Sequence, residues 1–460
     1  MTAANILGSM KQDGSRLMIH PADVKGRWMN WRRAVFAVLI AVYVAGPLIP
    51  VGGHPMIQLD VEHRRFFLFG STFNAQDFWM VLLLVLSFAF GLLLVTAWKG
   101  RVWCGWACPQ TVFLEGVYRP IERFFDGSRE QRIRLAAEPM SLKKFARRLG
   151  KYSVFLLVSI AIAHTATALF VSPKELFAMI TEGPRQHLEA FGLTTGFTAI
   201  LMFNFTWFRE QFCVVLCPYG RLQSVLHDKD SVTVAYRESR GEPRGKILKA
   251  AGVEAPKLGD CIDCKRCVAV CPTGIDIRDG LQMECLACTQ CVDACDEVMD
   301  KVKRPRGLID FASQNELKGE PRRTVRPRLM IYAGLMLISM TTLGVSLATR
   351  TPFEANIFRP RGGMPFVVDG DIVRNAFEVH VFNKNPENAR FTIALSGGPD
   401  EKRIVIGTPQ VELASLTDAH VPVSISIPRA QLGAPVELKL TVTDETNGVK
   451  KELRVGFLGR

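Results

Sequence analysis

The sequence predicts a multi-domain membrane protein with five transmembrane α-helices, a cytoplasmic cysteine-rich domain before the fifth helix, and a C-terminal immunoglobulin-like β-sandwich. Three observations predict this organisation. Uncharged apolar runs such as residues 81–95 are too long for the core helix of a soluble protein. Eight of the 12 cysteines lie between residues 261 and 295. After residue 350 the chain contains no cysteine and changes to short stretches in which apolar and polar residues alternate.

Five apolar segments are each close to the ~20 residues that cross the hydrocarbon core of a bilayer, namely residues 34–53, 78–98, 152–171, 191–208 and 329–348. The fourth is the shortest. The first follows a basic flank, as a signal peptide does, but it contains Pro47 and Pro50 and lacks a small-residue cleavage site. We therefore expect the first span to be retained.

The direction of the spans follows from the loop charges, because Lys and Arg beside a span resist translocation. The chain has 57 Lys and Arg against 44 Asp and Glu, a net charge of +13. This excess lies in residues 1–33, 99–151 and 209–328, and the segments on the other side of the spans are together close to neutral. The pattern predicts a multi-pass membrane protein whose N-terminus is cytoplasmic and whose C-terminus lies outside the cytoplasm; we expect the inner membrane of a bacterium, with the C-terminus in the periplasm. A basic excess beside the spans indicates contact with membrane lipid and no nucleic-acid partner.

All 12 cysteines precede Asp296, on the side predicted to be cytoplasmic, where thiolates serve as metal ligands rather than forming disulfides. Two motifs with the same spacing follow each other: Cys261, Cys264, Cys267 and Cys271 before Pro272, then Cys285, Cys288, Cys291 and Cys295. In this C-x2-C-x2-C-x3-C pattern, the fourth cysteine of each motif ligates the cluster of the other. The spacing therefore predicts two [4Fe-4S] clusters, the first on Cys261, Cys264, Cys267 and Cys295, the second on Cys271, Cys285, Cys288 and Cys291.

Two tetrahedral zinc sites are the alternative for eight cysteines. The tight spacing, its duplication and the proline after the first motif favour iron. Asp296 stands where the second motif usually has proline. Because proline is not a ligand, this change leaves all eight thiolates in place.

A shorter motif, C-x3-C-P, occurs at the end of the second and fourth spans: Cys104, Cys108 and Pro109, then Cys213, Cys217 and Pro218. The chain thus contains a weak internal repeat of a two-span hairpin that ends in this motif. Residues i and i+4 share one side of a helical turn, so each motif can present two sulfurs in one direction. Small-residue packing is the alternative for such cysteines. The duplication favours a redox or soft-metal site, and soft thiolates select Cu(I).

Other features are less specific. Trp103 and Trp106 are explained as anchors at the membrane interface. Asn204 in the fourth span has two open readings, a hydrogen bond between helices and a role in an electron path. The motifs C-x-x-C-H, G-x-G-x-x-G and H-E-x-x-H do not occur. Electrons are therefore expected from another protein, a quinol or a soluble reductant.

The C-terminal segment alternates as β-strands do, with Val421, Val423, Ile425 and Ile427 in one run and Val436, Leu438, Leu440 and Val442 in another. Asn447 and Gly448 supply a tight turn. About seven short strands in the last ~110 residues favour an immunoglobulin-like sandwich with a binding or scaffolding role. The whole chain is thus divided into a cytoplasmic N-terminal arm (1–33), a four-helix membrane region with both C-x3-C-P motifs (34–208), a ferredoxin-type domain with two [4Fe-4S] clusters (209–328), a fifth helix (329–348) and a periplasmic immunoglobulin-like domain (349–460).

The chain resembles the CcoG/FixG/RdxA family along essentially its whole length. The resemblance rests on the segment from Cys261 through residues 273–282 to Asp296, on residues 304–309, and on both C-x3-C-P motifs. Asp296, unusual among ferredoxins, fits this family. The resemblance implies an accessory protein for the assembly of a cbb-type cytochrome c oxidase, with cupric reductase activity that supplies Cu(I) to the haem-copper centre.

On this resemblance, an unidentified electron donor reduces the two clusters. The electrons then reach copper, the substrate, at or near Cys104, Cys108, Cys213 and Cys217. The implied partners are oxidase assembly factors or a copper transporter or chaperone. Two alternatives stay open, a quinol dehydrogenase module similar to the membrane ferredoxins of nitrate and nitrous-oxide respiration, and a scaffold whose clusters are structural.

Overall fold

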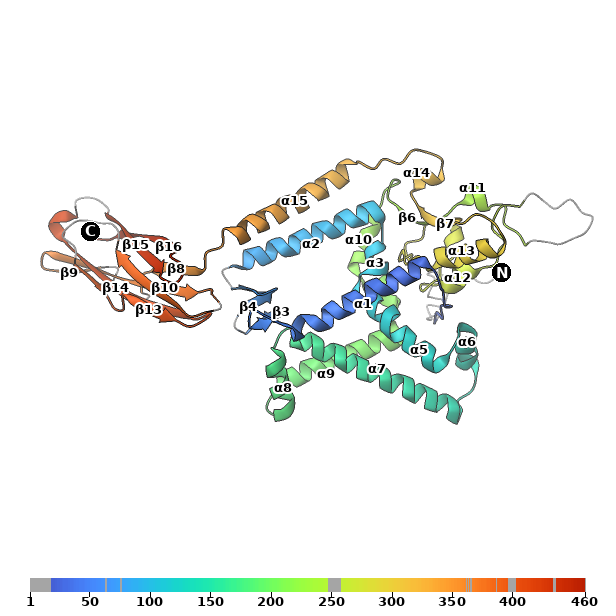
Figure 1. Ribbon diagram of the computed structural model, residues 1–460, viewed down its shortest axis with the longest axis horizontal. Coiled ribbons are helices and arrows are strands. Elements are labelled where there is room, and N and C mark those ends of the chain that lie inside the picture. The colour runs from blue at the N-terminus through green and yellow to red at the C-terminus, as the bar shows by residue number, and fades with distance from the viewer. Residues whose placement is uncertain are drawn as a thin grey trace, which may run out of the picture. The chain divides into compact units, whose positions relative to one another are not determined.

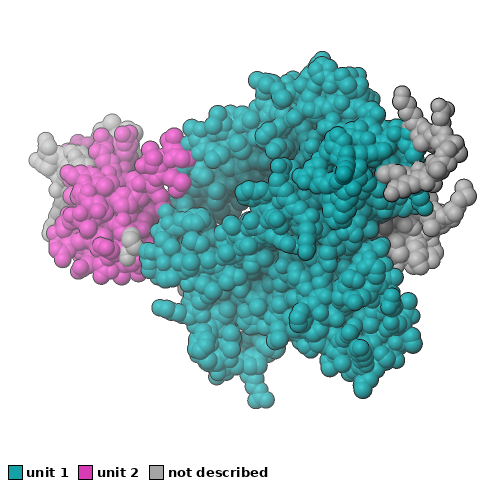
Figure 2. Space-filling view, turned by 45° about the vertical axis from the view of Figure 1, so that its right-hand side comes forward, with its two compact units in different colours: residues 1–343 teal, residues 344–460 magenta. Residues whose placement is uncertain are grey.

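The computed structural model describes residues 18–459, apart from 63, 75–76, 247–257, 361, 363, 365, 386, 396–402 and 433–435. The chain divides into two compact units, residues 1–343 and 344–460, which Figure 2 shows in different colours. The first unit holds the apolar helices and the cysteine-rich domain, and the second holds the β-sandwich. The first 17 residues of the predicted N-terminal arm lie outside the described residues.

In the part of the chain that the structure describes, five helical segments are long and apolar enough to cross a membrane, and they agree with the five predicted spans in number and order. They are α1 (Arg27–Leu48), α2 (Phe78–Lys99), α7 (Leu142–Ala168), α9 (Leu188–Phe203) with its π-helical continuation to Phe208, and α15 (Pro327–Ala348). Helices α1 and α7 begin earlier than predicted, because hydropathy detects only the apolar part of a helix. The first turn of α7 is polar and starts at Ser141, whose hydroxyl accepts a hydrogen bond from the backbone N–H of Lys144 at 3.2 Å.

Small polar side chains join these helices in pairs. The hydroxyl of Ser87 in α2 bonds to that of Ser339 in α15 at 2.9 Å, and Thr167 in α7 bonds to Thr194 in α9 at 2.9 Å. In a bilayer no hydrophobic driving force brings helices together. Small residues that allow close approach, and hydrogen bonds between helices, take its place. Large apolar side chains on the other faces, such as Leu157, stay exposed. This exposure is what a lipid-facing helix requires. Figure 1 shows α2 beside α15 and α7 beside α9.

The loops between the long helices contain short elements that the sequence analysis does not predict, because strands and helices of two to ten residues give little periodicity. They are β1 (Pro50–Val51), β2 (His54–Pro55), β3 (Ile57–Asp60), β4 (Arg65–Leu68), β5 (Ser71–Phe73), α3 (Val102–Trp106), α4 (Pro109–Phe113), α5 (Arg119–Asp126), α6 (Arg129–Ala137) and α8 (Pro173–Glu182). Strands β3, β4 and β5 form one antiparallel sheet. Helices α3 to α5 carry and support the first C-x3-C-P motif.

The described residues of the cysteine-rich domain form short helices and one two-stranded sheet. Its elements are α10 (Pro218–Leu226), β6 (Thr233–Tyr236), α11 (Glu238–Gly241), α12 (Arg266–Val270), α13 (Gln290–Lys301), β7 (Ile309–Ala312) and α14 (Gln314–Leu317). Strands β6 and β7 pair antiparallel and bring the two ends of the domain together. Helices α12 and α13 each follow one cysteine loop and pack against each other.

The residues before the first span belong to the cysteine-rich domain in space. The Asp293 carboxylate in α13 accepts hydrogen bonds from the backbone N–H groups of Trp28 (3.2 Å) and Met29 (2.7 Å), and Ala22 N–H donates to the Ala269 carbonyl at 2.8 Å. The N-terminus of α1 begins after Gly26, which has no side chain to cap it. A carboxylate from a distant helix therefore satisfies the free N–H groups and the positive end of the helix dipole.

The second unit is a two-sheet sandwich, as predicted. Among its described residues, one sheet has the order β12-β14-β10-β8 with β9 on the edge of β10, and the other has the order β13-β11-β15-β16. The strands are β8 (Phe353–Phe358), β9 (Val367–Asp369), β10 (Ile372–Asn383), β11 (Ala389–Leu395), β12 (Arg403–Ile406), β13 (Gln410–Leu413), β14 (Asp418–Pro428), β15 (Val436–Asp444) and β16 (Lys450–Phe457). The predicted alternating runs lie in β14 and β15. Their apolar residues, Ile425 and Leu440 among them, are fully buried in the core between the sheets.

Candidate iron-sulfur and thiol site

The two cysteine loops of the first unit have the same backbone conformation. Asp263 and Lys265 in the first loop have φ values of 51° and 53°, and Ala287 and Thr289, at the equivalent positions of the second, have 51° and 62°. Non-glycine residues rarely adopt this left-handed conformation, and it concentrates at functional sites. The two loops therefore turn in the same way beside their second cysteines, Cys264 and Cys288.

The structure gathers the eight cysteines around two cavities. Cys261, Cys264, Cys267 and Cys295 line one of them. Cys271, Cys285, Cys288 and Cys291 line the other, with Cys267 in the wall between the two. Each group takes three cysteines from one motif and one from the other, which is the grouping that the sequence predicts for two clusters. Ligation itself stays a prediction.

The chemistry of the two cavities fits an iron-sulfur cluster. Burial raises the pKa of the thiols of Cys267 and Cys285 to about 12 and that of Cys288 to about 11. Such thiols become thiolates when a cation binds them. Beside Cys288, the fully buried guanidinium of Arg32 has two terminal nitrogens with no hydrogen-bond partner among the described residues. An iron-sulfur cluster with four thiolate ligands has a net negative charge, because the thiolates outweigh the positive charge of its core. The buried positive charge of Arg32 suits such a cluster.

The sulfur spacing argues against zinc. Four thiolates around one Zn²⁺ at about 2.3 Å lie about 3.8 Å from one another. Among the described residues, the one group of three or more His, Cys, Asp or Glu with ligand atoms all within 4.8 Å of each other is His380, Asp418 and His420, in the second unit. No three cysteines of either cavity form such a group among the described residues, whereas four thiolates on one Zn²⁺ would.

The two C-x3-C-P motifs end in the same way and differ at their first cysteine. Cys108 and Cys217 are extended residues at the N-caps of α4 and α10, and Pro109 and Pro218 are the first residues of those helices. Proline favours this position and forces the residue before it out of the helical region. Cys104 lies in α3, and Cys213 lies in a π-helical turn, residues 212–216. Such turns are frequent at functional sites.

The four membrane-edge thiols lie together. Burial raises the pKa of Cys213 above its ordinary value, and the neighbouring charges of Cys108, Cys104 and Cys217 raise it further. Burial also raises the pKa of Cys104 to about 11. Burial raises the pKa of Cys108, and hydrogen bonds from the backbone N–H groups of Gln110 and Thr111 lower it by a smaller amount. Two hairpins of the repeat thus each contribute two sulfurs to one group, in which Cys104 is buried and Cys108, Cys213 and Cys217 are partly buried.

A chain of polar groups orients Cys104. The side-chain amide of Gln223 donates to the Cys104 sulfur at 3.3 Å, and its oxygen accepts from Arg101 Nε at 2.5 Å. The same guanidinium donates to the Gly220 carbonyl at 2.6 Å and to the Met283 carbonyl of the cysteine-rich domain. Arg101 therefore links the first motif, the helix after the second motif, and the loop before Cys285.

The first membrane-edge motif packs directly on the second cysteine loop. Cys104 forms one buried apolar cluster with Leu286 and Cys288, and Cys213 packs against it. A Cβ atom on Gly105 would lie 2.4 Å from the Leu286 carbonyl oxygen and 3.0 Å from Cys288 Cα. The Trp106 indole N–H donates to the Ala287 carbonyl at 3.3 Å. Trp106 thus binds the cysteine loop, in addition to any anchoring at the membrane interface.

Buried charges support the motifs from behind. Arg209 forms a bidentate pair with Glu122 at 3.1 and 3.2 Å, and Arg119 pairs with Glu115 at 2.9 Å. Burial raises the pKa of Glu122, but the Arg209 charge and hydrogen bonds outweigh burial and lower it to about 2. Asn204 exchanges amide hydrogen bonds with Gln110, two residues after Cys108. The reading of Asn204 as a partner between helices therefore has direct support.

Sequence reasoning finds all 12 cysteines and misses the residues that orient them. Arg32 is counted there as a loop charge, yet it is fully buried and its Nε donates to the Gly105 carbonyl at 2.8 Å. Gln223 and Arg101 belong to no motif. The hydrogen-bond partners of Arg32, Arg101 and Gln223 are 73 to 182 residues away along the chain. No local sequence pattern could therefore reveal these contacts.

Comparisons with known proteins agree with this description. A family model described as a 4Fe-4S dicluster domain matches residues 208–314, one described as a 4Fe-4S binding domain matches residues 81–128, and one described as an IG-like fold at the C-terminus of FixG matches residues 343–460. The second model covers Cys104 and Cys108 and none of the eight ferredoxin cysteines. The protein is therefore an iron-sulfur electron-transfer protein with a C-terminal immunoglobulin-like domain.

Similarity to curated proteins extends over nearly the whole chain. Nitrogen fixation protein FixG of Rhizobium meliloti is 33% identical over 450 residues, 88% of this chain and 84% of FixG. Protein RdxA of Cereibacter sphaeroides is 33% identical over 451 residues, 93% of this chain and 94% of RdxA. Ferredoxin-type protein NapH of Haemophilus influenzae is 22% identical over 293 residues, 60% of this chain and 89% of NapH. With its eight clustered cysteines, its paired C-x3-C-P motifs and its sandwich domain, the chain belongs to the FixG/RdxA family.

Proposed function

We propose that this protein reduces Cu(II) to Cu(I) at the four membrane-edge thiols, with electrons drawn from the cysteine-rich domain, for assembly of the haem-copper centre of a cbb-type cytochrome c oxidase. One observation carries the proposal. The first C-x3-C-P motif lies against the loop of Cys288, with contacts tight enough to require glycine at position 105. An electron leaving the second cavity therefore has a packed path to Cys104.

The electron balance is one electron per copper ion. Bound [4Fe-4S] clusters supply one-electron chemistry, and an external donor restores the electron that Cu²⁺ takes to become Cu⁺. The chain's own residues provide the acceptor site. Cys104, Cys108, Cys213 and Cys217 offer soft sulfur ligands that favour Cu(I), and their partial burial leaves the group open to an incoming ion. Gln223 and Arg101 hold Cys104 in place during the change of charge.

The loop charges support an orientation in which the N-terminus and the cysteine-rich domain are cytoplasmic and the C-terminal domain is periplasmic, in a bacterial inner membrane. In this orientation the donor is cytoplasmic or membrane-bound. A copper transporter or chaperone, or an oxidase assembly factor, then receives Cu(I). These partners are part of the proposal.

The proposal is tested with purified protein that has been reduced anaerobically and freed of excess reductant. Cu²⁺ is added, and the Cu(I) formed is measured with a Cu(I)-specific chelator. We expect oxidation of the clusters and release of stoichiometric Cu(I). The paired variants Cys104→Ser with Cys108→Ser, and Cys213→Ser with Cys217→Ser, should keep the iron-sulfur spectrum and lose most of the reduction rate.

Val215→Ser is the matched control, because it places the same hydroxyl between the two cysteines of the second motif. It should reduce copper at the normal rate. Normal copper reduction and copper affinity in both paired cysteine variants would refute the role of the membrane-edge thiols. Clusters that stay reduced when Cu²⁺ is added would refute cupric reductase activity altogether and leave a structural role.

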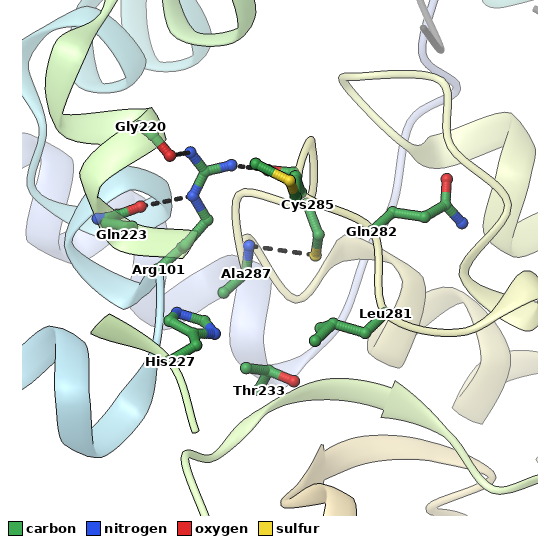
Figure 3. A pocket seen from close by; sticks show the side chains of 10 residues that line it. Arg101, Gly220, Gln223, His227, Thr233, Leu281, Gln282, Cys285 and Ala287 are labelled. Atoms are coloured by element: carbon green, nitrogen blue, oxygen red, sulfur yellow. Dashed lines mark hydrogen bonds between the residues drawn. The ribbon is translucent and has the colours of Figure 1, made fainter. Parts of the chain in front are cut away.

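A cavity beside the second cysteine group favours a second candidate, a quinol dehydrogenase. Figure 3 shows this cavity, lined by Arg101, Gly220, Gln223, His227, Thr233, Leu281, Gln282, Met283, Cys285 and Ala287. The buried Nε2 of His227 has no hydrogen-bond partner among the described residues. An imidazole beside apolar walls suits a quinol hydroxyl, and NapH is a relative of ferredoxin type. Oxidation of a quinol analogue that requires His227, without added copper, would favour this candidate.

A second assignment for the four thiols also has an observation in its favour. The segment with Cys104 and Cys108 matches a 4Fe-4S binding domain although the ferredoxin cysteines lie elsewhere. Four sulfurs from two hairpins could hold a third cluster that passes electrons onward. The iron content of the purified protein decides between the two assignments.

A further inference from the structure

Two antiparallel strands of the β-sandwich bring two histidines and two carboxylates to one outward face. Val379 and Val421 point into the core and are fully buried. Because side chains alternate along a strand, their neighbours Glu378 and His380 in β10, and His420 in β14, point the other way. The register sets His380 directly opposite His420. Asp418 precedes His420 by two residues and shares its face.

Three of these side chains, His380, Asp418 and His420, converge within ligand distance, and Glu378 contacts His420 from the other edge of its ring. The imidazole rings of His380 and His420 stack with centroids 4.4 Å apart. One oxygen of Asp418 lies 2.9 Å from His380 Nε2 and 3.6 Å from His420 Nε2, and the Glu378 carboxylate lies 3.1 Å from His420 Nδ1. Among the described residues, His380, Asp418 and His420 are the one set of potential metal ligands whose atoms all lie within 4.8 Å of each other.

The charges of the cluster favour a cation between the side chains. Two protonated imidazoles stacked at this distance repel each other, which costs stability in a cross-strand pair. Two neutral imidazoles with two carboxylates carry two negative charges, which one divalent ion cancels. His380 is 19% exposed and Asp418 is 49% exposed at the side chain. The group is thus partly sheltered and open to an ion from solution.

We propose that His380, Asp418 and His420 form a Cu(II) site on the immunoglobulin-like domain, with Glu378 holding the His420 ring through Nδ1. Imidazole nitrogen and carboxylate oxygen suit Cu(II), and copper heads the divalent affinity order for such ligands. The domain contains no cysteine, so its ligands are matched to the oxidised ion, whereas the thiols of the first unit are matched to Cu(I). This site takes no part in any redox step, and its existence does not depend on the proposed reduction.

The test uses full-length protein in detergent, with the clusters left unreduced so that added Cu²⁺ stays oxidised. One equivalent of Cu²⁺ should give an axial electron paramagnetic resonance spectrum with nitrogen couplings from two imidazoles. His380→Asn and His420→Asn should each lower the copper affinity at least about tenfold and remove one nitrogen coupling. Asp418→Asn should weaken binding by a smaller factor and leave both nitrogen couplings.

His187→Asn is the matched control, because His187 also pairs with a carboxylate, Glu182 at 2.6 Å, and lies in the first unit. It should leave the signal unchanged. Thermal unfolding of each variant verifies that the sandwich is intact, which we expect because all four side chains point away from its core. A wild-type spectrum without imidazole nitrogens, or one unaltered in folded His380→Asn and His420→Asn variants, would overturn the site. Neither result bears on copper reduction by the cysteine variants, so the two proposals fail independently.

Discussion

Gly105→Ala tests the contact on which the electron path depends. A Cβ atom at this position would stand 2.4 Å from the Leu286 carbonyl oxygen and 3.0 Å from both Cα and N of Cys288. Ordinary contact begins near 3.4 Å, so motif and loop must separate by about 1 Å. All three obstructing atoms belong to backbone, which cannot swing aside as a flexible side chain does. Overpacking of this kind costs about 1–3 kcal/mol.

The sign of the change in stability shows whether Gly105 lies in a tight contact. In an open helix, glycine to alanine stabilises a protein by about 0.5–1 kcal/mol, because glycine loses more backbone entropy on folding. Gly91→Ala in α2 is the matched control, since its Cβ would meet Met336 Sδ at an ordinary 3.6 Å. We therefore expect Gly91→Ala to be neutral or stabilising and Gly105→Ala to be destabilising by a margin of about 2 kcal/mol or more.

Thermal unfolding in detergent, followed by loss of the iron-sulfur absorbance, measures the stability of both variants. Mixing reduced protein with Cu²⁺ then measures how fast the clusters are oxidised. Gly105→Ala should be slower in this reaction, because the first motif is pushed away from the Cys288 loop. Equal stability of Gly105→Ala and Gly91→Ala, with equal oxidation rates, would refute a tight contact between motif and loop.

Three further predictions concern the cofactors, the orientation and the buried charges. Anaerobically purified protein should contain about eight iron and eight sulfide ions, from two clusters of four, and Cys271→Ser should damage the cluster of the second cavity although Cys271 belongs to the first motif. Zinc would contradict the cluster assignment, and about twelve iron ions would place a third cluster on the membrane-edge thiols. A reporter fused after Arg460 should be active only if it functions in the periplasm, and labelling of Lys318→Cys should require a membrane-permeant reagent; a cytoplasmic C-terminus would mean a miscounted span, first of all residues 191–208. The pKa of Glu122 is lowered from 4.5 to about 2 by Arg209. The Glu122–Arg209 ion pair should therefore add about 3 kcal/mol to the free energy of unfolding at pH values above 4.5, and this contribution should be lost as the pH falls through 2. Glu122→Gln should remove this part of the pH dependence of thermal unfolding and exposed Glu130→Gln should not, whereas the same pH profile in Glu122→Gln and wild type would show that Glu122 is not the group responsible.

The sequence predicts those parts of the fold whose signal is local. A membrane span needs only its own apolar residues, and a strand with one face in a core shows its own alternation, so α2 and β14 are both found with nearly correct bounds. Cysteine spacing is equally local. The four-residue strands β6 and β7 are missed, because each is formed by its pairing with a segment 76 residues away.

The site follows the same division. Cys271 can be assigned across to the second group because the motif fixes its neighbours, and the cavities agree with that grouping. The approach of Gly105 to Leu286 cannot be read from either segment, since glycine in a short helix signals only flexibility. Arg32 is likewise buried by segments that are distant in the sequence. Its position in a basic flank beside a span predicts an exposed side chain instead.

The hydrogen bonds from Trp28 and Met29 to Asp293 join residues 265 and 264 positions apart. During synthesis, the segment with Trp28 and Met29 leaves the ribosome long before α13 exists, and the apolar helices α2, α7 and α9 are made in between. Contacts of such sequence separation form late and slowly. The N-terminal segment can therefore bind the cysteine-rich domain only after these helices have been made. A chain that ends before α13 would lack the Asp293 carboxylate, and the first N–H groups of α1 would be left without this partner.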